Sequence, residues 1–171
     1  MCFNPVKNGL EKDICLLSFT LLFVYKYKTT KTMGNGVKFI IGIIIAAHGT
    51  FARSAMELVE MLSGPKESVR TVSFEPGQST DHLLSCIQTA VNELENPDGI
   101  LIVTDIKGGS PCNVATLMQK TRAKVQVLHG LNIPMLLQLF DDRAAGSGWD
   151  EMAGSAVEIG KFGVGRIQLE Q

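Results

Sequence analysis

A long apolar run, Val37 to Ala47 (VKFIIGIIIAA), ends directly before His48 and constrains the fold more than any other segment. It is rich in isoleucine, nearly continuous, and shows no alternation of polar and apolar residues. A strand that other elements cover on both faces has this pattern. We therefore expect a central strand of a sheet, with helices on both faces and His48 at the carboxyl end of the strand.

Strand-like and helix-like segments alternate after this run. Further strands are expected at 69–74, 99–104 and 125–129, and helices are expected to begin near residues 50, 80, 110, 134 and 149. This alternation predicts one α/β domain with three layers, α-β-α, around a mainly parallel sheet with right-handed crossovers. The tail 164–169 alternates in hydropathy as an edge strand does.

Residues 1–33 do not share the pattern of the rest. Their apolar run, Ile14 to Tyr25, is shorter than the roughly 20 residues that a membrane-spanning helix needs. No cleavage site of small residues follows it, as a secretory signal would require. We interpret residues 1–33 as an extension outside the fold, with translation starting at Met33 and the domain at 34–171. A hydrophobic anchor is the alternative.

Composition narrows the function classes. A formal net charge of −1 gives no reason to expect nucleic acid or an anionic membrane as partner. The four cysteines form no CxxC pair and have no histidine at metal-binding spacing. We therefore expect a reduced, cytoplasmic protein without disulfides, zinc or another metal.

Functional groups of parallel sheets collect beyond the carboxyl ends of the strands. His48 stands at such an end, and Gly49 and Thr50 open the helix that follows. Amide groups and the helix dipole favour an anion there, and a neutral imidazole is a good nucleophile. From position alone, a phosphate-accepting histidine and a structural histidine are equally consistent.

Asp105 ends the expected third strand and is followed by Gly108, Gly109 and Ser110. Its carboxylate could accept a hydrogen bond from His48 and so set the imidazole tautomer; a helix-capping or turn aspartate is the alternative. The two glycines allow close approach of a ligand, and Ser110, expected as N-cap, could contact phosphate. Since no GK[ST] follows, this is not a nucleotide-binding P-loop.

Four strings strengthen this combination: IIIAAHGTFA, FEPGQS, VTDIKGGSPCNVA and GLNIPML. In this order and spacing the chain resembles the IIA domains of the mannose/fructose/sorbose phosphotransferase system, from about residue 39 to 168. The resemblance implies a phosphohistidine at His48, a partner aspartate at Asp105 and a hydroxyl contact at Ser110. It further implies a phosphocarrier without a cofactor, supplied by HPr and discharged to a IIB component with IIC and IID membrane components. A homodimer that exchanges an antiparallel C-terminal edge strand is implied too.

Two positions depart from the family's pattern. Lys107 stands where many members carry an aromatic residue; it could contact phosphate, alter the IIB interface, or be a plain exposed lysine. His129 replaces a small residue at a strand carboxyl end; it could approach the site, but we expect it to be partly buried and structural.

Two other functions remain open at this stage. One is the phosphotransfer subunit of a dihydroxyacetone kinase, which also uses an early histidine. The other is a non-catalytic regulatory or binding module. Nothing in the sequence indicates which sugar is transported.

Overall fold

The computed structural model describes residues 40–94 and 97–167. The elements, in chain order, are β1 (Ile41–His48), α2 (Phe51–Ser63), β2 (Val69–Phe74), α3 (Thr80–Asn92), β3 (Gly99–Thr104), α4 (Ser110–Thr121), β4 (Val125–His129), α5 (Ile133–Ala144) and α6 (Trp149–Phe162). All four strands up to residue 129 and all five helices are therefore found where the sequence predicts them.

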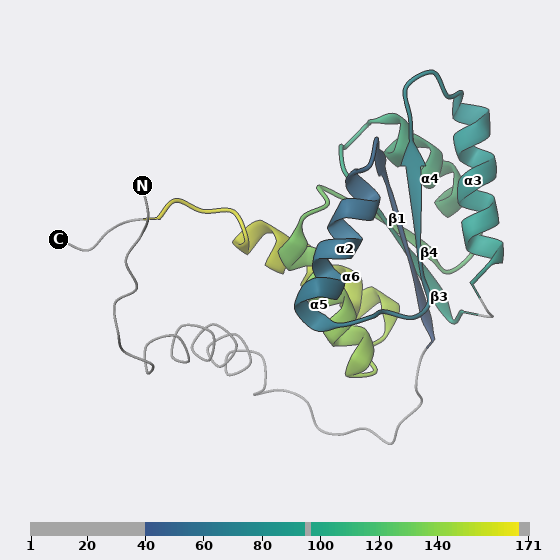
Figure 1. Ribbon diagram of the computed structural model, residues 1–171. Helices are drawn as coiled ribbons and strands as arrows, with labels where there is room; N and C mark the ends of the chain where they lie inside the picture. Colours follow the sequence, from purple (N-terminus) through teal and green to yellow (C-terminus); the bar gives the residue numbers. More distant parts are fainter. Residues whose placement is uncertain (1–39, 95–96, 168–171) are drawn as a thin grey trace, which may run out of the picture. The chain divides into compact units, whose positions relative to one another are not determined.

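The four strands form one parallel sheet in the order β2-β1-β3-β4 (Figure 1). Parallel strands need long crossovers, and helices supply these on both faces. Helices α2, α5 and α6 cover one face, and α3 and α4 cover the other. The predicted three-layer α-β-α class is confirmed.

β1 is central because its side chains fill both halves of the core. Ile43 and Ile45 pack with α2 and α5, whereas Ile44 and Ala46 pack with α3 and α4. All four are fully buried. Burying an isoleucine side chain contributes about 1.5–3 kcal/mol, so a segment that is apolar on both faces is most stable inside the sheet. This burial holds the carboxyl end of β1 in place.

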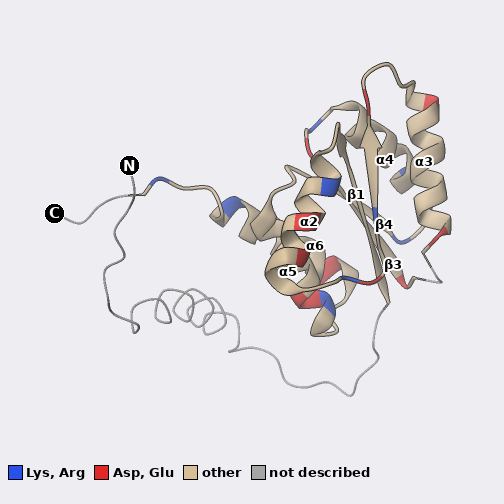
Figure 2. Ribbon diagram, viewed as in Figure 1, with Lys and Arg blue, Asp and Glu red and all other residues tan. Residues whose placement is uncertain are grey.

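Charged residues lie on helices and loops (Figure 2). Among Asp, Glu, Lys and Arg, Arg70 alone falls within the four described strands, at the edge strand β2. None of the described helices combines the length and hydrophobicity that crossing a membrane requires.

Two predictions concern the ends of the chain. Residues 164–167 form no strand in the single chain, and the rest of the predicted tail strand lies outside the described residues. The predicted extension 1–33 and its boundary also lie outside them. The described part of the sheet is therefore entirely parallel.

Candidate active site

The carboxyl ends of β1 and β3 bring His48 and Asp105 together. The two strands are neighbours, and their register pairs Ala46 with Thr104. Asp105, the first residue after β3, therefore lies beside the end of β1. Two residues 57 positions apart in sequence thus meet at the carboxyl ends of the strands. Parallel folds place their functional groups at this end of the sheet.

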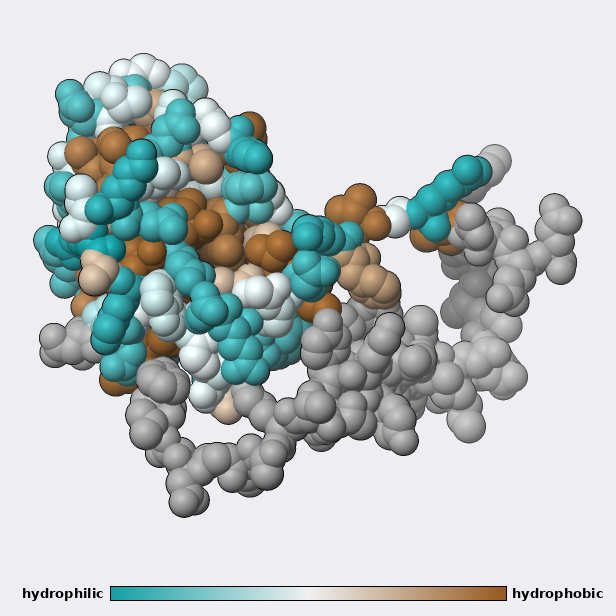
Figure 3. Space-filling view, turned by 180° about the vertical axis from the view of Figure 1, so that it is seen from behind, coloured by the Kyte–Doolittle hydropathy of each residue, from teal (hydrophilic) through white to brown (hydrophobic). Residues whose placement is uncertain are grey.

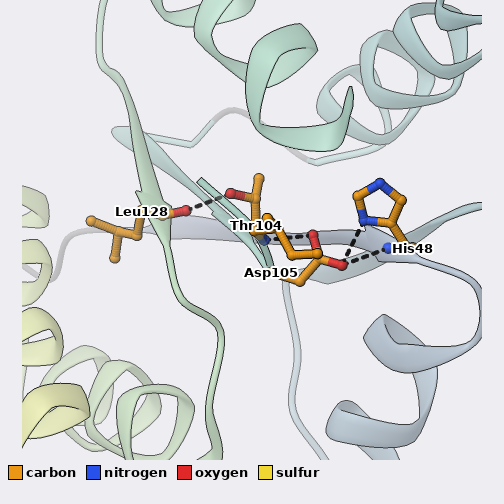
Figure 4. A network of polar contacts seen from close by, with 5 residues as sticks. His48, Thr104, Asp105 and Leu128 are labelled. Atoms are coloured by element: carbon orange, nitrogen blue, oxygen red, sulfur yellow. Dashed lines mark hydrogen bonds and ion pairs between the residues drawn. The ribbon is translucent and has the colours of Figure 1, made fainter. Parts of the chain in front are cut away.

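The Asp105 carboxylate holds His48 at two points (Figure 4). Its Oδ2 accepts the backbone N–H of His48 at 2.9 Å and lies 2.8 Å from the imidazole Nδ1. Its Oδ1 accepts the backbone N–H of Ile106 at 2.8 Å. An ionised carboxylate only accepts, so Nδ1 carries the hydrogen and Nε2 is left with a free lone pair.

The same contacts keep Asp105 ionised. Burial raises the pKa of the Asp105 carboxyl, but hydrogen bonds from the His48 N–H, the His48 ring and the Ile106 N–H outweigh it. The pKa therefore lies below its usual value, because each of these donors favours the charged form. The site thus contains a permanent carboxylate at neutral pH.

The imidazole is accessible on its other side. The His48 side chain is 39% exposed, compared with 8% for Asp105. Nε2 points away from the carboxylate (Figure 4). Phe74, at the end of β2, stands edge-on to the ring at a centroid distance of 5.7 Å, and its carbonyl accepts the N–H of Gly49 at 2.9 Å. The ring is therefore held from two neighbouring strands while its nucleophilic nitrogen faces outward.

A tight turn, Ile106 to Gly109, closes over the ring. The N–H of Gly109 donates to the Ile106 carbonyl at 3.1 Å, and Gly108 has a φ of 76°, which only glycine adopts readily. A Cβ on Gly109 would lie 2.9 Å from His48 Cε1. Glycine at this position therefore allows backbone to approach the imidazole edge that carries Nε2.

Ser110 is not the N-cap that the sequence suggests. Gly109 is the N-cap of α4, Ser110 is its first residue, and no side chain caps the helix. The reason is the turn: it gives Gly109 the extended backbone of an N-cap and brings Ser110 into the first helical position. Ser110 is partly exposed, and its hydroxyl makes no hydrogen bond among the described residues. Its predicted phosphate contact stays a prediction.

Thr50 is the N-cap of α2, and its side chain makes no capping hydrogen bond. Gly49, before it, has a φ of 55° and turns the chain from β1 into the helix. Both helices at the site, α2 and α4, thus begin without a side-chain cap, and uncapped N–H groups at a helix start favour an anion.

Three supporting residues were missed at the sequence level. Thr104 is fully buried, and its Oγ1 donates to the Leu128 carbonyl at 3.0 Å. Asn113 Nδ2 donates to the Gly108 carbonyl at 2.9 Å and fixes the turn. Phe74 is the third. Each is an ordinary strand or helix residue in sequence, so no local signal distinguishes it.

The two residues that depart from the family pattern differ in position. Lys107 is exposed at the corner of the turn over His48. His129 is exposed too, so the prediction of a partly buried histidine is wrong. His129 lies on the edge strand β4 and pairs in register with Thr104, which pairs with Ala46. It is therefore two strands across and two residues along from His48, about 12 Å between Cα atoms. An edge strand leaves its last residue uncovered.

Within residues 40–94 and 97–167, no three His, Cys, Asp or Glu side chains are grouped so that they could hold a metal ion. The site is instead composed of a nucleophilic ring, a carboxylate and helix starts.

Comparisons with known proteins agree with this geometry. Residues 42–157 match the family model described as PTS system fructose IIA component. The chain is 34% identical over 130 residues to the mannose-specific EIIAB component of Escherichia coli (strain K12), covering 76% of this chain but 40% of that protein. It therefore spans less than half the length of this relative.

Two solved structures have the same fold. An EIIA component from Streptococcus agalactiae has a TM-score of 0.69 at 28% identity, covering 74% of this chain and 97% of the other. A mannose/sorbose-specific IIA subunit from Enterococcus faecalis has a TM-score of 0.70 at 26% identity, covering 77% and 98%. With a family model that matches most of the folded chain, the protein belongs to the PTS fructose IIA component family.

Proposed function

We propose that the chain is a phosphocarrier of a sugar phosphotransferase system, which accepts a phosphoryl group on His48 Nε2 and passes it on. The observation that carries this proposal is the Asp105 carboxylate 2.8 Å from Nδ1, with the opposite nitrogen accessible. A hydrolase triad would place a hydroxyl or thiol nucleophile next to the imidazole. No such contact to His48 occurs in the described residues, so the ring itself is the nucleophile.

The transfer follows from this geometry. The lone pair of Nε2 attacks phosphorus in line and forms a nitrogen–phosphorus bond. The bond between phosphorus and the donor's histidine nitrogen breaks, and its electron pair stays on the donor ring. Asp105 keeps the proton on Nδ1 and stabilises the positive charge that the phosphorylated ring acquires. Because similar bonds form and break, the transfer is reversible.

Positioning and electrostatics supply the rest of the catalysis. The uncapped starts of α2 and α4 direct N–H groups and the positive ends of their helix dipoles toward charge on the transferring group. Gly49, Thr50, Gly108 and Gly109 form this cradle, and Ser110 offers its hydroxyl from the first turn of α4.

Family membership supports a proposal for the partners. Phospho-HPr supplies the phosphoryl group, and a IIB component with IIC and IID membrane components takes it up, with the carrier in the cytoplasm. We also propose a homodimer that exchanges the C-terminal strand. Val164 and Ile167 are 78% and 88% exposed, and Figure 3 shows hydrophobic residues on the segment after α6. An apolar tail and a sheet with two open edge strands, β2 and β4, suit such pairing between subunits.

The test is incubation of the full chain with phosphoenolpyruvate, the first PTS enzyme and HPr. We expect one acid-labile phosphoryl group per chain, absent in His48→Ala and retained in the control His82→Ala, which changes an exposed histidine on α3. Absence of label in the wild type, or unchanged label in His48→Ala, would contradict the proposal. The labelled protein is then mixed with IIB or with dihydroxyacetone kinase subunits, and the component that takes up the label is the acceptor. Binding of HPr without any label on the chain would indicate a regulatory module.

A further inference from the structure

The turn over His48 contains a cationic residue, Lys107, whose side chain is exposed. Lys107 occupies the second position of the turn Ile106 to Gly109, between the aspartate that orients the ring and the glycine that approaches Cε1. Lys107 therefore lies two residues from the point where backbone approaches the accessible imidazole, so its long side chain is within reach of a phosphoryl group carried there.

Three hydrogen bonds fix the backbone of the turn that contains Lys107. Asp105 Oδ1 accepts the Ile106 N–H, the Gly109 N–H closes the turn, and Asn113 Nδ2 binds the Gly108 carbonyl. Because the backbone is fixed, only the side-chain torsions of Lys107 change when the ammonium contacts the phosphoryl group. The contact therefore costs side-chain conformational entropy but little backbone entropy.

The ammonium has no competing partner. Lys107 makes no hydrogen bond or ion pair within the described residues, and the Asp105 oxygens are occupied by three N–H donors. A phosphorylated imidazole adds about two negative charges and three acceptor oxygens at this point. Charge-assisted hydrogen bonds to phosphate are among the stronger contacts available at a surface.

We propose that Lys107 is a phosphate-contacting residue that stabilises the phosphorylated state of His48. The proposal rests on the phosphocarrier function above and adds a residue that the pairing of His48 with Asp105 does not involve. Lys107 would raise the fraction of the carrier that is phosphorylated at equilibrium with its donor, in addition to any effect on docking.

The experiment measures the equilibrium constant for transfer between a fixed pool of phospho-HPr and the full chain. Lys107→Met should lower this constant about three- to tenfold, the range for one partly screened ionic contact. Lys107→Arg should stay within about twofold of wild type. Lys120→Met, which removes an exposed lysine from the last turn of α4, is the matched control and should leave it unchanged. Rising salt should reduce the difference between wild type and Lys107→Met.

An equilibrium constant does not depend on the encounter complex, so a lysine that only docks HPr would alter the transfer rate and leave the constant unchanged. That result, or equal losses in the Lys107→Met and Lys120→Met variants, would overturn the proposal while leaving the phosphocarrier function intact. A wild-type chain that accepts no phosphoryl group would instead refute the function, and the role of Lys107 with it.

Discussion

Asp105→Asn replaces one carboxylate oxygen at the centre of the site by an NH₂ group and tests the tautomer argument directly. In the wild type, one carboxylate accepts three N–H groups, two from His48 and one from Ile106. An amide has one oxygen and one NH₂ group, so it cannot accept from both sides. If its oxygen faces Ile106, its NH₂ faces both the backbone N–H and the ring of His48. The backbone N–H then loses its acceptor, and the ring avoids a clash of donors by carrying its hydrogen on Nε2.

The magnitude follows from those hydrogen bonds. The reactive tautomer loses a bond to a charged acceptor, worth about 1.5–3 kcal/mol, and the unreactive one gains a neutral bond worth about 0.5–1.5 kcal/mol. The tautomer equilibrium therefore shifts by about 2–4.5 kcal/mol, which is a decrease of about 30- to 2,000-fold in the transfer rate.

The assay is the single-turnover rate of transfer from radiolabelled phospho-HPr at neutral pH. Urea unfolding should be recorded in parallel as a function of pH. The lowered pKa of Asp105 means that the folded protein binds this proton less tightly than the unfolded chain. The resulting stabilisation is present above the ordinary aspartate value, about 4, and is lost as pH falls through the lower folded value.

Asp105→Asn should therefore lack this part of the acid dependence, and its stability should approach that of the wild type as pH falls. Transfer at the wild-type rate by a folded Asp105→Asn variant would refute the orienting role. A stability difference from the wild type that does not shrink on acidification would refute the assignment of the pKa to these hydrogen bonds.

Two further predictions concern the turn and the opposite end of the sheet. Gly109→Ala should slow phosphorylation at least tenfold, because its Cβ would lie 2.9 Å from His48 Cε1; Gly154→Ala, with nothing within 4 Å, is the control and should transfer normally. Equal rates for both would contradict the close approach. Arg143→Met should lower the free energy of unfolding by about 1.5–3 kcal/mol in urea titration while leaving transfer unchanged. Its guanidinium donates to the carbonyls of Ile41, Glu67 and Ser68, at the far end of β1; a neutral result would show that water replaces these bonds without loss.

Much of the architecture follows from local pattern. The Ile-rich run before His48 is apolar on both faces, and only a central strand buries both faces at once. Period-3.6 apolar positions and turn residues then place the helices between strands. The pairing partner of a tail strand cannot be read this way, because an edge strand pairs with whatever edge is free.

The sequence by itself determined that His48 ends a buried strand and that an aspartate and a glycine-rich loop end another. Tertiary structure alone decided the contacts. The parallel register joins Asp105 to both the backbone and the ring of His48 across 57 residues, and the turn makes Gly109, not Ser110, the N-cap of α4. It also leaves His129 exposed on an edge strand. Which strands are neighbours is not encoded in any single segment, and the backbone angles of the turn, although local, are not fixed by residue type alone.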